Sequence, residues 1–313
     1  MAHVTALQTG NRTPGRGETE AALSLAARLP RIMLESRRVA AAAHGVHGRR
    51  RAGQGESFWQ FRPFSPGEAA ARIDWRRSAR DQRLYVRQRE WEAAQSVWLW
   101  IDRSASMAFA SSLAQTSKVE RAIVVGFALA DALVEAGERV GLLGLLPPRA
   151  SRRIVEDLAE AMVLDKAGEE RDLPPRESLP PLNEAVLVSD FLVPPAALAA
   201  SVEGLASRGA RGHLILVADP VEETFPFTGQ AELADPEAGL RLRVGDAASW
   251  GEDYRARLAQ HRAAITAITA GRGWTMSIHR TDRPASEGLL RALTLIAASR
   301  GAAAGPSVGA WAP

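Results

Sequence analysis

Oxygen-bearing side chains gather at the end of one strongly apolar stretch of the chain. The stretch VWLWI, residues 97–101, is followed at once by Asp102, Ser104 and Ser106. This D-x-S-x-S spacing places one carboxylate and two hydroxyls on one side of a turn, and such oxygens are the ligands that hard divalent cations take. Ligands of open α/β sheets bind beyond the carboxyl ends of the strands. We therefore expect a divalent-metal site at this strand end.

Two further aspartates end apolar runs in the same way. Asp190 ends the run in AVLVSDF, and Asp219 ends the run in HLILVADP. A parallel sheet would bring all three aspartates to one edge, so we expect Asp190 to complete the metal site, directly or through a water molecule. A simpler alternative is that Asp102 and Asp190 only cap the following helices and that the serines are ordinary turn residues.

The elements that must position these residues alternate between strand and helix. Apolar, strand-like runs lie at 97–101, 139–146, 185–189, 213–218 and 274–279, and helical patterns lie near 117–136, 151–164, 195–208, 250–271 and 285–299. The alternation predicts an α/β fold of Rossmann type with a doubly wound, mostly parallel sheet. The weaker pattern over 219–248 predicts an inserted hairpin.

The chain divides into four expected regions. Residues 1–18 are polar and without periodicity, and residues 301–313 are small and interrupted by Gly and Pro, so we expect both to be disordered. Residues 19–95 predict an N-terminal helical segment, with a break or kink at Pro30, and a small β-rich extension. Residues 96–300 form the α/β domain.

Composition excludes several classes of site. The chain has no cysteine, which excludes disulfides and thiolate ligands, and 37 of its 39 basic residues are arginines. Residues 1–96 carry a net charge of +8, against +3 for the whole chain. Only His44 and His47 among the six histidines have a metal-ligand spacing, and we expect them to be solvated. No membrane-length apolar run or secretory signal is present, so we expect a cytoplasmic protein.

Two motifs resemble known families. IDRSASM, followed much later by LVSDF, resembles the metal-ion-dependent adhesion site, MIDAS, of von Willebrand factor A-type domains. The upstream block FRPFSPGEAAARIDWRRSARDQRLYVRQREWE resembles the signature of a bacterial family known as domain of unknown function fifty-eight, and the likeness spans about residues 40–298. The matching positions are Arg62, Phe64, Pro66, Gly67, Glu68, Arg72, Ile73, Asp74, Trp75, Ala79, Arg80, Tyr85 and Val86.

The resemblance implies a fold and a function. It implies a von Willebrand factor A-like domain in which Asp102, Ser104, Ser106 and Asp190 hold a divalent cation, with Mg²⁺ expected. It also implies an adaptor or chaperone-like protein whose partner is a MoxR-type AAA+ ATPase or its client. A non-enzymatic role is expected from the residues themselves, because no histidine lies close to Ser104 and Ser106 in sequence and no Walker-type or G-x-G-x-x-G loop is present. A carboxylate of the partner would then be the last metal ligand.

One departure from the MIDAS pattern affects the expected affinity for metal. A-type domains usually supply a threonine from a loop between the second and fourth core strands. Residues 165–183 contain no threonine, and Ser178 is the only hydroxyl in that segment. The cation is therefore expected to bind weakly or together with the partner.

Two alternative functions come from other residues. Trp59, Trp75 and Tyr85 could stack on nucleic-acid bases while arginines 49–51 meet phosphates, although a packed β-subdomain explains these aromatics more simply. A hydrolase would use Asp190 or Asp219 to activate a metal-bound water. We expect Asp74 to be ion-paired with the arginines around it and to fix the β-rich block.

Overall fold

The computed structural model describes residues 30–41, 58–65, 73–80, 83–89, 95–234 and 239–303. The chain divides into two compact units, one made of residues 1–47 together with 95–313 and the other of residues 48–94. Residues 1–18 and 304–313, for which the sequence predicts disorder, lie outside the described residues. No helix in the described ranges is long and apolar enough to cross a membrane.

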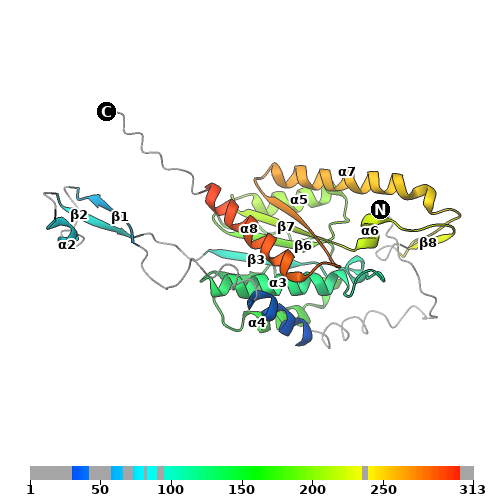
Figure 1. Cartoon of the computed structure of the whole chain (residues 1–313), viewed down its shortest axis with the longest axis horizontal. Coiled ribbons are helices and arrows are strands. Elements are labelled where there is room, and N and C mark those ends of the chain that lie inside the picture. Colours follow the sequence, from blue (N-terminus) through cyan, green and yellow to red (C-terminus); the bar gives the residue numbers. More distant parts are fainter. Residues whose placement is uncertain are drawn as a thin grey trace. The chain divides into compact units, whose positions relative to one another are not determined.

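A six-stranded sheet forms the centre of the larger unit (Figure 1). Its strands are β3 (Ser96–Ile101), β4 (Arg139–Leu142), β5 (Leu146–Arg149), β6 (Glu184–Ser189), β7 (Arg211–Ala218) and β10 (Thr275–Arg280). The strand order is β10-β7-β6-β3-β4-β5, and every pair is parallel except β4 with β5. The predicted α/β fold with a mostly parallel sheet is confirmed.

Helices cover both faces of this sheet, which is why its strands are apolar on both sides. The helices are α3 (Lys118–Glu135), α4 (Ile154–Leu164), α5 (Pro195–Ala206), α6 (Pro220–Thr224), α7 (Gly251–Ala270) and α8 (Ala285–Ala303). Leu99 and Ile101 pack with α3, α4 and α8, whereas Trp98 and Trp100 pack with α5 and α7 on the other face. Alternate residues of one strand thus serve two hydrophobic cores.

The winding direction of the sheet reverses between β3 and β6. The chain runs from β3 outward to β4 on one side, and then crosses to β6 on the other side of β3. In open α/β sheets ligands bind at the carboxyl ends of the strands where the order reverses. The residues that follow β3 and β6 therefore occupy the position where this fold binds ligands.

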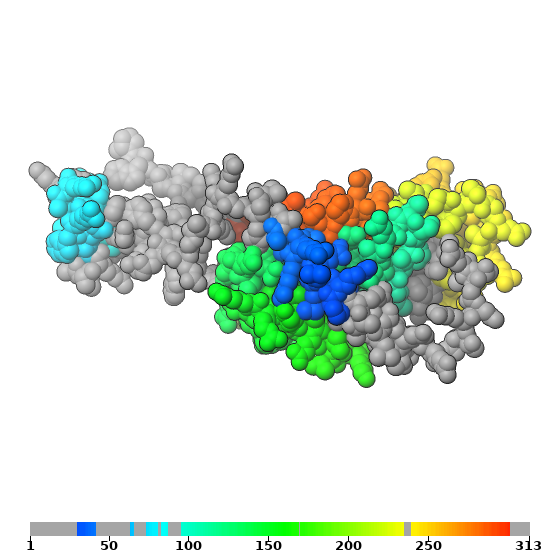
Figure 2. All heavy atoms as spheres, turned by 60° about the horizontal axis from the view of Figure 1, so that its bottom comes forward, coloured from blue at the N-terminus to red at the C-terminus, as the bar shows by residue number. Residues whose placement is uncertain are grey.

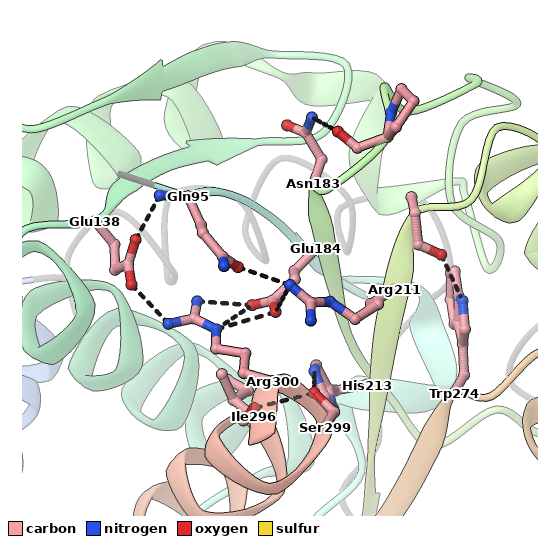
Figure 3. A network of polar contacts seen from close by, with 12 residues as sticks. Gln95, Glu138, Asn183, Glu184, Arg211, His213, Trp274, Ile296, Ser299 and Arg300 are labelled. Carbon is pink, nitrogen blue, oxygen red and sulfur yellow. Dashed lines mark hydrogen bonds and ion pairs between the residues drawn. The ribbon is translucent and has the colours of Figure 1, made fainter. Parts of the chain in front are cut away.

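A buried ionic network holds the opposite, amino end of the strands (Figure 3). Glu184 at the start of β6 is fully buried and is ion-paired with Arg211 of β7 at 3.1 Å and with Arg300 of α8 at 2.7 Å. Arg300 also bonds Glu138, which accepts the backbone N–H of Gln95 just before β3. The start of each central strand is thereby fixed to α8.

The segment 139–146 differs from the single strand that its apolar run predicts. It forms β4, a turn, and the first residue of the antiparallel edge strand β5. Gly144 lies in the turn with φ of +75°, a conformation that favours glycine. The hydrophobic pattern could not show this turn because residues on both sides of it are apolar.

The helix over residues 30–41 packs onto the larger unit. Its Ile32 and Ala40 are buried in the same core as α3, α4 and α8. Arg37 on its surface reaches Glu156 of α4, and Figure 2 shows this helix in blue beside the green residues. Pro30 stands at the start of the described helix, a position that suits proline because the first helical N–H has no partner to lose. The residues before Pro30 lie outside the described ranges, so the predicted break or kink there stays a prediction. The sequence grouped this helix with the β-rich extension, whereas its buried side chains belong to the sheet domain.

Two hairpins agree with the sequence. In the smaller unit β1 (Phe58–Pro63) pairs antiparallel with β2 (Tyr85–Arg89), and α2 (Trp75–Ser78) lies between them in sequence. In the larger unit β8 (Ala231–Ala234) pairs antiparallel with β9 (Arg241–Val244), which confirms the inserted hairpin. Helix α8 continues to Ala303, so residues 301–303, expected in the disordered tail, are helical.

Candidate metal centre

Asp102 follows β3 directly and is held by two hydrogen bonds. Its Oδ1 accepts the backbone N–H of Ser104 at 2.8 Å, and its Oδ2 accepts the hydroxyl of Ser189 at 2.6 Å. Asp102 is 1% exposed as a residue, so it is almost entirely shielded from water. Ser189 is the last residue of β6, so the side chain of Asp102 is tied across the point where the sheet order reverses.

Ser104 and Ser106 lie beside one another in the loop that follows. Ser104 immediately precedes the short 3-10 helix η2 (Ala105–Ala108), and the two Oγ atoms are 3.3 Å apart. Both serines are buried. The structure therefore brings together the two hydroxyls and the carboxylate of the D-x-S-x-S motif.

Asp190 follows β6 and is held in a strained turn. Its Oδ1 accepts the backbone N–H of Leu192 at 3.1 Å, and its Oδ2 accepts the ammonium of Lys118 at 2.8 Å. The next residue, Phe191, has φ of +51°, which is rare for a bulky side chain. The hydroxyl of Ser189 accepts the backbone N–H of Phe191. The Nε2 atom of His261 lies within hydrogen-bond distance, 2.8 Å, of the carbonyl oxygen of Phe191. Strain of this kind persists only where surrounding contacts enforce it.

The two aspartates interact electrostatically. Burial, and after it the negative charge of Asp190, raise the pKa of Asp102 to about 7. Hydrogen bonds from Ser189 and Ser104 act in the opposite direction. A cation between these carboxylates would offset both the burial and the mutual repulsion, so the oxygen donors at this edge fit a divalent cation.

The serine hydroxyls are essential to this fit. In the parts of the chain that the structure describes, no group of three or more His, Cys, Asp or Glu side chains is arranged to hold a metal ion. Two carboxylates and two hydroxyls would thus have to supply the protein ligands, and all four are hard oxygen donors of the kind that Mg²⁺ prefers.

Lys118 is the residue of this centre that the sequence reasoning missed. It is the first residue of α3, its side chain is fully buried, and its ammonium lies 2.8 Å from Asp190 Oδ2 and 2.5 Å from Glu222 Oε1. One signal was available. The chain has only two lysines among 39 basic residues, and this one opens an apolar helix just after the D-x-S-x-S motif.

Asp219 has a capping role in the structure. Its Oδ1 accepts the N–H of Val221 and its Oδ2 accepts the N–H of Ser111, each at 2.9 Å. Together with Glu222 it forms a capping box at the start of α6. Asp219 therefore caps α6, and its side chain also fixes the loop that follows η2.

The segment 165–183 approaches the centre through Arg103 and not through Ser178. Arg103 is buried and donates to the carbonyls of Met162 and Asp165 and to the Asp165 carboxylate, at 2.7–2.8 Å. Ser178 Oγ instead lies 2.8 Å from the Oγ of Ser207, which is the C-cap of α5. Because α5 begins near the carboxyl end of β6 and runs back along the sheet, Ser178 lies at the far end and cannot replace the threonine.

The signature residues of the smaller unit are only partly described. Arg62 lies in β1, Arg80 follows α2 and is exposed, and Pro66, Gly67 and Glu68 lie outside the described residues. Asp74 caps α2 by accepting the N–H of Arg77 at 2.9 Å, so it stabilises the block through the backbone. Trp75 is 62% exposed, and the guanidinium of Arg77 covers the ring of Tyr85.

Sequence relatives with no assigned function align over most of the chain. The uncharacterized proteins Rv1480 of Mycobacterium tuberculosis and Mb1516 of Mycobacterium bovis are 28% identical over 265 residues, which cover 77% of this chain and 79% of each relative.

Two solved structures align with lower similarity. An aerotolerance-related membrane protein from Bacteroides fragilis is 15% identical with a TM-score of 0.38, over 64% of this chain and 99% of that one. The conserved hypothetical protein BatB from Bacteroides thetaiotaomicron is 15% identical with a TM-score of 0.37, over 66% of this chain and all of that one. A family model described as protein of unknown function DUF58 matches residues 60–264, so the chain belongs to this family.

Proposed function

We propose that this protein is a non-enzymatic, metal-dependent protein-interaction module. Asp102, Ser104, Ser106 and Asp190 hold a divalent cation, Mg²⁺, and a carboxylate of a partner protein is its last ligand. The observation that carries the proposal is the placement of Asp102 and Asp190 at neighbouring strand ends where the sheet order reverses, next to two adjacent hydroxyls.

The larger unit is, in this proposal, a von Willebrand factor A-like domain with a MIDAS-type site. Its central strand β3 ends at Asp102, and its one antiparallel strand lies at the edge. The rigid hydrogen bonds of Asp102 and the strained turn at Phe191 support a site that is formed before the partner arrives.

The proposed partner is a MoxR-type AAA+ ATPase or its client, in the cytoplasm. In this role the protein is an adaptor or an assembly factor, and the acidic side chain that it grips belongs to the partner. Because a metal-bound carboxylate is the central contact, recognition depends on the cation and on one acidic residue of the partner.

A pull-down from cells of the source bacterium, with the full chain as bait, tests this proposal. With Mg²⁺ present we expect the bait to retain an AAA+ ATPase, and with EDTA or in Asp102→Ala we expect the ATPase to be lost. Asp253→Ala is the matched control, because this aspartate is an exposed residue of α7 and not a proposed ligand. Retention of the ATPase by Asp102→Ala in EDTA would refute the metal-dependent mechanism.

A further inference from the structure

A buried ammonium group lies where a metal ligand is proposed. Lys118 is one of the largest fully buried side chains in the described structure, and it reaches Asp190 from the first turn of α3. Its second partner, Glu222, is fixed by α6, because Glu222 Oε2 accepts the N–H of Asp219 at 2.9 Å. The centre of the Phe109 ring lies 5.7 Å from the ammonium nitrogen of Lys118.

The surroundings keep this lysine charged. Burial by itself lowers the pKa of Lys118, but the charges and hydrogen bonds of Asp190 and Glu222 outweigh it and raise the pKa above its ordinary value. A buried charge persists only when it is paired and hydrogen-bonded, and both conditions are met here. The ammonium is thus a paired and hydrogen-bonded cation inside the centre.

The formal charges of the centre show what this cation does. Asp102, Asp190 and Glu222 carry three negative charges when ionised, and the charge of Asp190 raises the pKa of both other carboxyls. Lys118 leaves a net charge of −2, which one divalent cation cancels. Without Lys118 the three carboxylates would present a net charge of −3 to the same divalent cation. The cation would then also have Asp190 to itself, because no ammonium would be bound to that carboxylate.

We propose that Lys118 is a built-in cation that competes with the divalent metal for Asp190 and so sets a low metal affinity in the absence of a partner. The inference rests on the proposed metal site. It supplies a physical cause for a cation that binds firmly only when the partner adds its own carboxylate to the centre. The missing threonine and the competing ammonium then act in the same direction.

The test is the Mn²⁺ affinity of the full chain, measured by titration calorimetry with the wild type and three variants. Lys118→Met removes the charge and keeps most of the apolar stem, and we expect it to bind Mn²⁺ on the order of tenfold more tightly than the wild type. Lys118→Arg keeps the charge and should bind no more tightly than the wild type. Lys166→Met is the matched control, because the second lysine of the chain is exposed, and it should leave the affinity unchanged.

Failure of this inference can be told from failure of the proposed function. Equal Mn²⁺ affinity in wild type and Lys118→Met would overturn the role of Lys118 and leave the metal site standing. Absence of Mn²⁺ binding in both would overturn both. If Lys118→Met does not fold, the double variant Lys118→Met with Glu222→Gln removes the ammonium together with one of its carboxylates. That variant must bind Mn²⁺ more tightly than the wild type, or the inference is wrong.

Discussion

At the scale of single residues, the hydroxyl of Ser189 connects the two proposed metal ligands. It donates to Asp102 Oδ2 at 2.6 Å and accepts the N–H of Phe191, the residue after Asp190, at 2.9 Å. One buried side chain thus fixes the carboxylate at the end of β3 and the strained turn at the end of β6. Groups that orient metal ligands in this way tune affinity without touching the metal.

Ser189→Ala should therefore weaken both stability and metal binding. The change leaves the N–H of Phe191 and one oxygen of Asp102 without these partners, so we expect the free energy of unfolding in urea to fall by about 1–3 kcal/mol. The Mn²⁺ affinity should fall by roughly 10–100-fold. Ser249→Ala, at an exposed serine, is the control. A Mn²⁺ affinity equal to that of the wild type would show that Ser189 does not orient the site.

At the scale of elements, the β4–β5 hairpin depends on the absence of a side chain at Gly141. A Cβ atom there would lie 2.4 Å from the carbonyl oxygen of Leu146 and 2.6 Å from the backbone nitrogen of Pro148. Both are backbone atoms of the neighbouring strand, so they cannot rotate away. The close approach of the two backbones explains how a short edge strand with two prolines pairs with β4.

Gly141→Ala should consequently force the hairpin apart. We expect a loss of about 1–3 kcal/mol in the free energy of unfolding, measured by urea denaturation, because overpacking shifts the backbone. Gly245→Ala is the matched control, since a Cβ there meets nothing within 4 Å and its backbone is not left-handed. Equal stability of the two variants would contradict the tight pairing of β4 with β5.

At the scale of the whole molecule, the helix over residues 30–41 joins the core of a domain whose sheet begins more than fifty residues later in the chain. Ile32 is 1% exposed within the core that α3, α4 and α8 share, whereas Leu34 on the same helix is 53% exposed. The larger unit therefore consists of two separate segments of sequence.

Ile32→Ala should accordingly destabilise the entire larger unit. Loss of a buried isoleucine side chain costs about 2–5 kcal/mol when the cavity does not collapse, and thermal unfolding should show a lower midpoint for a single transition. Leu34→Ala is the control and should change stability by less than about 0.5 kcal/mol. If the two variants unfold alike, the helix does not belong to the cooperative core.

The sequence predicted the larger elements well because their signals are local. The apolar run at 97–101 became β3, and the helical pattern near 117–136 became α3, each within a residue or two. A strand that is buried on both faces has a continuous run of apolar residues, and a helix that is buried on one side has apolar residues at helical spacing. Both patterns can be read directly from the sequence. The turn at Gly144 has no such pattern in the sequence, because the residues on both sides of it are apolar and the turn arises from the antiparallel pairing of β4 with β5.

At the centre, the sequence by itself determined that Asp102, Ser104 and Ser106 follow one strand and that Asp190 follows another, since each strand is specified by its own residues. Only the tertiary structure decided how the charges pair. Lys118 meets Asp190 across 72 positions and Glu222 across 104, and Ser178 is carried to the far end of α5. The physical reason is that spacing along the chain fixes neighbours within a loop, whereas the partner of a buried charge is chosen by which helix and strand ends the sheet order brings together.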